Sequence, residues 1–363
     1  MKVSSRILVA LLFSAVLGSA AFAQVGVVLP TKDEPRWIQD QTRFEAAFKA
    51  AGIQAQVLFS QGDSAKEKAN VESLIASGIK VLVICPQDGA AAGAAAESAH
   101  KAGVKVISYD RLIMGTDAVD YYVTFDSSAV GAAWGKYLVD KAGKTKKNNL
   151  YLYAGAASDN NAFIFFDGAW SVLQPKIVDG TFVIKNSSEA VKVQKKATLT
   201  RDEKAAIIGQ ITTNWAFADA KNKAESNLTA AKKADKGTVF IVGPNDGTAR
   251  AIADAFAADK DVKKYYITGQ DAEKASIQYI IDGKQSMTVF KDVRTLCADA
   301  IAAAAAFSKD QVPTSVAVPA VLNDNGKIKV PCKPSAIVTV TKDNVKAAII
   351  DSGYYNASEF TGL

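Results

Sequence analysis

The chain has 363 residues, of which 49% are hydrophobic and 22% are charged. This balance excludes disordered and collagen-like proteins, and the length favours two domains because single hydrophobic cores rarely exceed ~250–300 residues. Lys and Arg outnumber Asp and Glu only by 43 to 37, an excess too small and too dispersed for a protein that binds nucleic acid.

Residues 1–23 have the pattern of a secretory signal peptide. Lys2 and Arg6 precede an apolar run at 7–17, and Ala21-Phe22-Ala23 fits a signal-peptidase site. The alternative is an uncleaved membrane anchor, but a spanning helix needs ~20 apolar residues. We therefore expect cleavage after Ala23 and a mature chain exported to the periplasm.

From Gln24 onward, short β-rich runs alternate with longer helical patterns, which predicts an α/β fold with parallel sheets covered by crossover helices. Strands are expected at 25–29, 54–59, 81–85, 104–108, 121–124, 150–153, 182–184, 238–242, 265–268 and 287–290, and helices at 38–51, 71–79, 94–102 and 297–307. The basic stretch 141–147 separates two such series and predicts a junction between two doubly wound lobes. A turn at 323–326 and a strand at 337–340 follow, so we expect the chain to cross back between the lobes.

The chain has three cysteines. Cys85 lies in an apolar run and is expected to be buried. Cys297 and Cys332 are the candidates for a disulfide, but the alternative of two free thiols is equally open, since the sequence does not show whether their Cα atoms lie within ~7 Å. With a single histidine, His100, and no C-x-x-C motif, neither a metal site nor another cofactor is expected.

Polar residues are concentrated just beyond the predicted strands, where open parallel sheets bind ligands. Each of them alone would suit a helix N-cap or a turn. As a set they contain three cations and three acids, and a balanced cluster of this kind suits a neutral ligand with many hydroxyl groups. The candidate residues are Arg36, Asp110, Arg111, Asn160, Asn161, Asn245, Asp246, Asp271 and Lys291.

Trp37 and Trp215 offer broad apolar faces on which a sugar ring can rest, although core packing explains a tryptophan equally well. The glycine-rich phosphate-binding motifs and the G-x-S-x-G nucleophile motif are absent from the sequence. A glycosidase needs only two carboxylates, so this enzyme class stays open. The pattern favours a binding protein over an enzyme.

Several segments together resemble the periplasmic sugar-binding proteins of ABC importers, in particular the xylose-binding and multiple-sugar-binding branch. The resemblance covers nearly the whole chain after residue 23. It is carried by the opening that includes Arg36-Trp37, by Ile107-Ser-Tyr-Asp110-Arg111, by Asp159-Asn-Asn-Ala162, by Gly269-Gln-Asp-Ala272 and by Met287-Thr-Val-Phe-Lys291.

The resemblance implies a type I periplasmic binding fold, in which two lobes joined by a three-strand hinge close on a pyranose. The first lobe would comprise 24–128 plus 292–309, and the second 129–291 plus 310–363. The sugar would be held by Trp37, less securely by Trp215, and by the polar residues Arg36, Asp110, Arg111, Asn161, either Asn245 or Asp246, Asp271 and Lys291. D-xylose is the first choice of sugar, and glucose, galactose and arabinose follow. The implied partners of this monomer are the permease and ATPase of an ABC importer; the alternative is a sugar sensor that docks on a chemoreceptor or sensor kinase.

Overall fold

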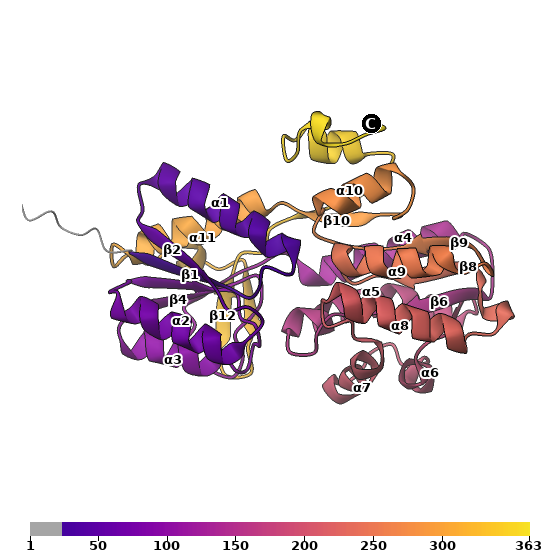
Figure 1. Ribbon diagram of the computed structural model, residues 1–363. Coiled ribbons are helices and arrows are strands. Elements are labelled where there is room, and N and C mark those ends of the chain that lie inside the picture. The colour runs from indigo at the N-terminus through magenta and orange to yellow at the C-terminus, as the bar shows by residue number, and fades with distance from the viewer. Residues whose placement is uncertain (1–23) are drawn as a thin grey trace, which may run out of the picture.

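The computed structural model describes residues 24–363, which form two α/β lobes (Figure 1). The predicted signal peptide and its cleavage site at Ala23 lie outside the described residues. Within residues 24–363, no helix combines the length and the apolar character that crossing a membrane requires.

The first lobe is built on a seven-stranded sheet of order β11-β12-β5-β4-β3-β1-β2. Its strands are β1 (Val25–Leu29), β2 (Ala55–Phe59), β3 (Val81–Ile84), β4 (Lys105–Tyr109), β5 (Tyr121–Val123), β11 (Val321–Asp324) and β12 (Lys329–Cys332). All neighbours are parallel except the β11–β12 hairpin. The apolar residues of α1 (Pro35–Ala51) and α11 (Val293–Phe307) cover one face, and those of α2 (Ser64–Ala76) and α3 (Gly93–Lys101) cover the other.

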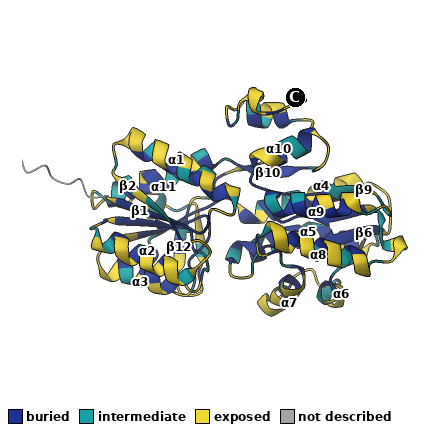
Figure 2. Ribbon diagram, in the orientation of Figure 1, coloured by how far each residue is buried: buried dark blue, intermediate teal, exposed yellow. Residues whose placement is uncertain are grey.

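The second lobe contains a parallel four-stranded sheet of order β7-β6-β8-β9. These strands are β6 (Asn148–Leu152), β7 (Phe182–Ile184), β8 (Gly237–Val242) and β9 (Val262–Ile267). The helices α4 (Ser127–Ala142) and α5 (Asn160–Val178) cover one face, and α8 (Phe217–Ala230) and α9 (Asp246–Ala258) cover the other. The shorter α6 (Ser188–Val193) and α7 (Arg201–Ile211) follow β7, and their buried residues join the apolar cluster of α4 and α5. The other faces of these two helices include exposed residues (Figure 2).

A smaller unit at the edge of the second lobe pairs β10 (Thr288–Lys291) with β13 (Ile337–Val340) in antiparallel register. It packs with α10 (Lys274–Ile281) and with the C-terminal segment, residues 341–363, in one apolar cluster. That segment contains a π-helical turn at Lys346–Ile350 and a 3-10 turn at Ala357–Glu359. Tyr354 in this segment is 3% exposed and its hydroxyl donates to Gln39 Oε1 of α1 at 3.1 Å, so the C-terminal segment contacts both lobes.

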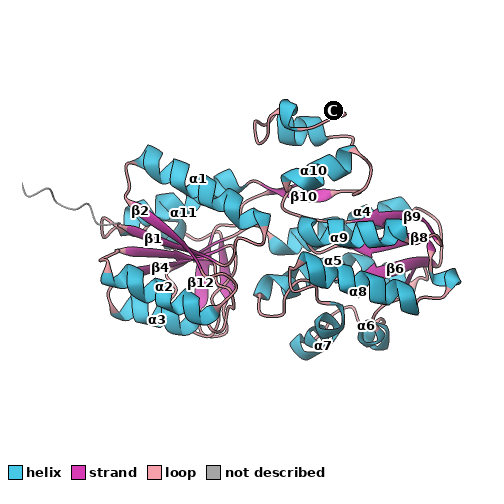
Figure 3. Ribbon diagram, viewed as in Figure 1, coloured by secondary structure: helices cyan, strands magenta, loops and turns pink. Residues whose placement is uncertain are grey.

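The chain passes between the lobes three times: after β5, after β10 and after β12 (Figure 3). The first and third passages are hydrogen-bonded to each other, since Ser335 N donates to Thr124 O at 2.8 Å and Asp126 N donates to Ser335 O at 3.3 Å. The predicted fold class, two doubly wound parallel lobes, is confirmed. All ten strands expected through residue 290 and the strand at 337–340 are present, with ends shifted by at most three residues.

Two expectations differ from the structure. Residues 321–332 were expected in the second lobe, but they form β11 and β12 and extend the first sheet, where Cys332 lies opposite Tyr122 of β5. The short α12 (Thr314–Ala317) precedes this hairpin and contacts β12.

Of the two alternatives for Cys297 and Cys332, the structure has the two free thiols and not the disulfide. All three cysteines are buried and free in the described chain. Cys297 of α11 packs with Val81 and Val83 on one face of the first sheet, whereas Cys332 packs with Leu82 and Ile84 on the other. Because alternate residues of a strand face opposite sides, the sheet itself separates the two thiols.

Candidate functional site

A cleft lies between the lobes at the carboxyl ends of both parallel sheets. Both sheets have the doubly wound order in which the second strand lies outside the first, and ligands bind such folds at the switch point beside the first strand. The cleft is lined by Glu34, Arg36, Trp37, Asp110, Arg111, Asp159, Asn161, Phe165, Trp215, Asn245, Gln270, Asp271 and Lys291.

Arg36 is the central cation of the cleft. It lies in the first turn of α1, directly after Pro35, and is 2% exposed. Its Nη2 donates to Asp110 Oδ2 at 3.0 Å, and its Nη1 donates to Asp271 Oδ1 of the other lobe at 3.1 Å. The guanidinium also lies over the ring of Trp37, 5.1 Å from its centroid. Arg36 thus joins carboxylates from both lobes.

Lys291, the last residue of β10, faces the same two carboxylates. Its Nζ lies 2.8 Å from Asp271 Oδ1 and 3.9 Å from Asp110 Oδ2. Burial alone would raise the pKa of the Asp110 carboxyl, but Lys291, Arg36 and Arg111 together hold that pKa below its usual value. Asp110 is therefore ionised and available as a hydrogen-bond acceptor.

Arg111 forms a second bridge between the lobes. It pairs with Glu34 Oε1 at 3.2 Å in its own lobe and with Asp159 Oδ2 at 3.2 Å across the cleft. Burial raises the pKa of the Asp159 carboxyl to about 6, against the lowering effect of Arg111. Burial likewise raises the pKa of the Glu34 carboxyl. Arg111 thus lies between one acid from each lobe, and the pKa of both acids is raised by burial.

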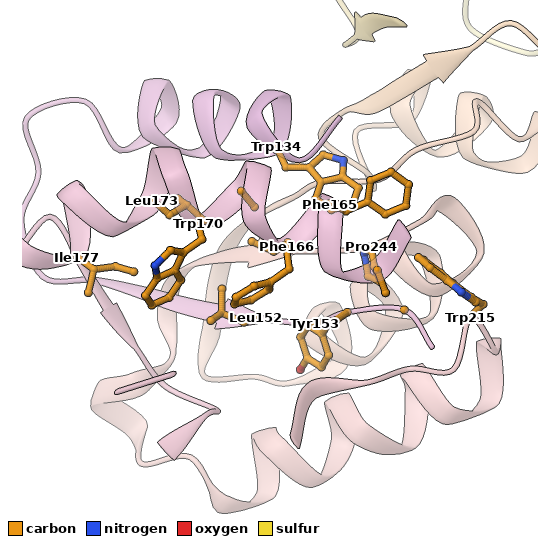
Figure 4. Close-up of a pocket in the computed structure, with 15 residues that line it drawn as sticks. Trp134, Leu152, Tyr153, Phe165, Phe166, Trp170, Leu173, Ile177, Trp215 and Pro244 are labelled. Atoms are coloured by element: carbon orange, nitrogen blue, oxygen red, sulfur yellow. The ribbon is translucent and has the colours of Figure 1, made fainter. Parts of the chain in front are cut away.

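Aromatic rings form the apolar walls. Trp37 comes from the first lobe, and Phe165 and Trp215 come from the second, where their rings meet edge to face with centroids 6.3 Å apart. Trp215 has a φ of 60°, and a Cβ on Gly155 would lie only 1.9 Å from its ring. Behind them the second lobe holds an apolar pocket that shares Phe165 and Trp215 with the cleft (Figure 4). Only a glycine at position 155 therefore leaves room for the ring of Trp215.

Three buried polar atoms of the cleft lack a hydrogen-bond partner among the described residues: the donors Trp37 Nε1 and Trp215 Nε1, and the acceptor Gln270 Oε1. Buried polar atoms are almost always paired in folded proteins. The free space between the cleft side chains is about 20 Å³, since cations and anions of the two lobes contact each other directly. A ligand would therefore enter as the lobes part and would replace these ion pairs.

Nine of the eleven residues predicted from the sequence line the cleft, and two do not. Asn160 is turned to the surface, where its Oδ1 accepts a hydrogen bond from Arg201 at 2.8 Å. Asp246 is fully buried behind the cleft, and its carboxylate accepts from Gln285 Nε2 at 2.7 Å and from the backbone N of Glu273 at 2.9 Å. Of the two alternatives Asn245 and Asp246, Asn245 is the one that lines the cleft.

Sequence reasoning missed four lining residues: Glu34, Asp159, Phe165 and Gln270. Three of them, Glu34, Asp159 and Gln270, lie in stretches just past a strand that also contain predicted residues. The rule that ligands bind beyond the carboxyl ends of parallel strands therefore selects these three as well. Phe165 lies one helical turn after Asn161 on α5, and the i, i+4 spacing places both on one face.

The cleft has three cations and four carboxylates and therefore lacks the surplus positive charge that a phosphate or another anion needs. Among residues 24–363, no group of three or more His, Cys, Asp or Glu side chains is arranged to hold a metal ion. The arrangement can pair with a small, polar, uncharged molecule through many donors and acceptors at once.

Two doubly wound lobes with polar side chains from both facing one cleft define the class of bilobal solute-binding proteins. Residues 25–311 match the family model of the periplasmic binding protein domain. The chain belongs to this family.

Relatives and solved structures agree with this assignment. The chain is 34% identical to the multiple sugar-binding periplasmic protein SbpA of Azospirillum brasilense, over 93% of this chain and 90% of the relative, and 30% identical to the D-xylose-binding periplasmic protein of Escherichia coli, over 96% of each. A carbohydrate transporter solute-binding protein from Chloroflexus aurantiacus, solved in complex with D-glucose, is 71% identical with a TM-score of 0.91, covering 94% of this chain and 98% of that one. A solute-binding protein from Clostridium phytofermentans with bound β-D-glucose is 32% identical with a TM-score of 0.80, covering 92% and 99%.

Proposed function

We propose that this protein captures an aldopyranose in the cleft between its lobes and delivers it to an ABC importer. The observation that carries the proposal is the composition of the cleft: nearly balanced acids and bases from both lobes, flanked by aromatic rings. A hydroxyl group can donate to a carboxylate and accept from a guanidinium or ammonium at the same time. A sugar with several hydroxyls is therefore the natural replacement for the ion pairs that now span the cleft.

The same geometry explains why binding favours closure. A sugar held by Asp110 and Arg111 of the first lobe and by Asn161 and Asp271 of the second makes its full set of contacts only when the lobes are shut. Its binding free energy then shifts the population toward the closed state. The closed state is the form that we expect the importer to recognise, and the process includes no catalytic step.

We propose D-glucose and D-xylose as the leading ligands. The family resemblance made xylose the first choice, and the relatives include a D-xylose-binding protein and a 71% identical protein complexed with D-glucose. The two sugars share their ring and the configuration of C2 to C4, and differ by the hydroxymethyl group at C5. Galactose and arabinose follow, since an epimer leaves a charged group of the cleft without its partner, at about 1–3 kcal/mol.

The experiment is a thermal-shift screen of the mature chain with about ten aldoses, followed by titration calorimetry of the sugars that respond. A ligand present at 100 times its Kd stabilises the folded protein by ~2.7 kcal/mol, which gives a clear rise in Tm. We expect a response to one or two aldopyranoses and none to amino acids or sugar phosphates. A protein that responds to sugar phosphates alone, or to no sugar, would contradict the proposal.

A further inference from the structure

Behind Arg36 lies a buried group of side chains that does not line the cleft. Asp40 follows Arg36 by one turn of α1 and is fully buried. Its Oδ2 accepts from Arg36 Nε at 2.6 Å, and its Oδ1 accepts from Arg36 Nη2 at 3.3 Å. Asp40 therefore contacts the guanidinium from the side opposite to Asp110 and Asp271.

The third member of the group is Tyr109, the last residue of β4. Its hydroxyl donates to Asp40 Oδ1 at 2.5 Å and lies 3.3 Å from Cys297 Sγ of α11. Its ring packs on Phe44 with centroids 4.8 Å apart. The group thus ties α1, β4 and α11 together directly beneath the cleft.

The donors of arginine are arranged in a rigid planar fork. With the Nε–Nη2 edge of the fork held by Asp40, Nη1 and the second N–H of Nη2 face the cleft, where they meet Asp271 and Asp110. Asp110 follows Tyr109 directly in the chain. The hydroxyl of Tyr109 therefore fixes the spacing between the cation on α1 and the acid that follows β4.

We propose that Asp40 and Tyr109 are positioning residues that hold the Arg36 guanidinium in its ligand-binding orientation before the sugar arrives. The inference rests on the proposed function, since it assigns these residues a part in the same cleft. Neither residue touches the ligand. Their contribution is preorganisation, because an Arg36 side chain that is already held in the ligand-binding orientation loses less conformational freedom on binding.

The first test uses Tyr109→Phe, which removes one hydroxyl and keeps the ring that packs on Phe44. We expect the Kd for the responding sugar to rise about tenfold, the size of effect for one hydrogen bond to a charged group. Asp40→Asn should raise the Kd about a hundredfold, because the guanidinium loses a buried counter-charge.

The matched control is Tyr151→Phe. Tyr151 is 1% exposed on β6, its ring packs edge to face on Phe256, and its hydroxyl donates to Asp235 O at 2.9 Å. This variant also loses one hydrogen bond of a buried tyrosine hydroxyl, here to a backbone carbonyl of the second lobe, away from Arg36. We expect it to lower the Tm and to leave the Kd unchanged.

A double-mutant cycle separates positioning from general loss of packing. In an Arg36→Lys background there is no fork to orient, so adding Tyr109→Phe should change the Kd less than twofold. The NMR signal of Arg36 Nε–H in the sugar-free protein gives a second readout, and it should broaden or shift in Tyr109→Phe but not in Tyr151→Phe.

If the unmodified protein binds no sugar, the proposed function fails, while the NMR signal still reports on the orientation of Arg36. If it binds sugar and Tyr109→Phe binds equally well with an unchanged Arg36 signal, the positioning role is refuted. An equal loss of affinity in Tyr109→Phe and Tyr151→Phe would also overturn it.

Discussion

The ion pair between Arg36 and Asp271 lies at the centre of the cleft and joins the two lobes. Its atoms are 3.1 Å apart, and the side chains are 3% and 7% exposed. Lys291 shares the same carboxylate oxygen at 2.8 Å. Removing one partner of a buried pair leaves a charge uncompensated, at a cost of about 3–5 kcal/mol. Single substitutions here should therefore act strongly on ligand binding.

We predict that Asp271→Ala or Arg111→Ala abolishes the thermal stabilisation by sugar, while each sugar-free variant still melts cooperatively. Both variants remove a group that would contact the ligand and leave opposite charges in the cleft unpaired. Asp282→Ala, an exposed acid of the same lobe as Asp271, serves as the control and should respond like the unmodified protein. Calorimetry at matched sugar concentrations measures the effect, and retained binding by either cleft variant would count against the site.

Asp159 predicts a dependence of stability on pH. Its pKa rises from 3.8 to about 6 in the folded protein, so the folded state holds a proton that the unfolded chain releases between these values. This group alone therefore makes the free energy of unfolding fall as pH rises from about 4 to 6, by up to about 3 kcal/mol.

The variant Asp159→Asn should lack that slope. Asparagine keeps an oxygen to accept from the backbone N of Asn161, as Asp159 Oδ1 does at 2.8 Å, so the start of α5 is preserved. Urea unfolding at pH 4, 5, 6 and 7 should show the stability of the unmodified protein falling relative to the variant across this range. Parallel curves for the two proteins would show that Asp159 does not titrate there.

At the level of single residues, the rule that ligand-binding side chains follow the ends of parallel strands predicted most of the cleft residues. It placed Arg36, Asp110 and Lys291 correctly because the carboxyl ends of parallel strands converge. The rule could not decide which of Asn245 and Asp246 lines the cleft, because two adjacent residues at the start of a helix point in different directions. For the same reason it wrongly predicted Asn160 together with Asn161, which does line the cleft.

At the level of elements, the loop between β9 and α10 presents Asp271 to the cleft. Asp271 has a φ of 99° and Ala272 a φ of 50°, both unusual for residues other than glycine. Asp271 N donates to Val289 O at 2.9 Å, and the backbone N of Glu273 donates to Asp246 at 2.9 Å. A strained backbone at Asp271 and Ala272 persists only where surrounding contacts hold it. The hydrogen bond from Glu273 N to Asp246 is one of these contacts.

We predict that Asp246→Ala destabilises the protein by about 2–3 kcal/mol, because the donors of Gln285 and Glu273 lose their buried acceptor. Burial and the nearby Glu273 raise the pKa of Asp246 well above its usual value, so a neutral side chain suits this position. Asp246→Asn should accordingly cost about 1 kcal/mol less than Asp246→Ala. Chemical denaturation measures both, and an equal loss in the two variants would mean that the acceptor oxygen is unimportant.

The hairpin of β11 and β12 shows what the sequence pattern leaves open. A turn was predicted at 323–326 from the Asn-Asp-Asn-Gly letters, but Asn323 and Asp324 belong to β11 and the turn follows at 325–328. Val321 and Leu322 are exposed and give no buried pattern. The placement of the hairpin depends on pairing between Cys332 and Tyr122, about 200 residues earlier. Pairing with so distant a strand produces no recognisable pattern in the local sequence, so the structure was needed to assign this stretch to a lobe.

At the level of the whole molecule, the C-terminal segment, residues 341–363, links the two lobes through Tyr354. Tyr354 packs on Phe290 of β10 with centroids 4.6 Å apart, and the guanidinium of Arg43 on α1 lies 5.5 Å from the Tyr354 ring. Arg43 Nη2 also donates to Tyr354 O at 3.4 Å. These contacts join the two lobes in this structure and should favour this arrangement over a more open one.

We predict that Arg43→Gln shifts the sugar-free protein toward more open forms. Loss of a half-exposed cation–π contact is worth about 0.5–1 kcal/mol, which lowers the ratio of closed to open forms about two- to fivefold. Small-angle X-ray scattering should show a larger radius of gyration without sugar and the unmodified value with saturating sugar. Lys49→Gln, at an exposed site on the same helix, should scatter like the unmodified protein, and equal scattering from both variants would rule out a role for the contact.

The three passages of the chain also bear on synthesis. The core of the first lobe includes Leu296 and Phe307 of α11, and its sheet includes β12, which ends at Cys332. Although most of this lobe is encoded in the first third of the chain, a ribosome must add the residues of the second lobe before the first can be finished. Domains usually fold one after another as they emerge, but here the lobe begun first is completed last, so a chain stopped near residue 290 would leave both lobes unfinished.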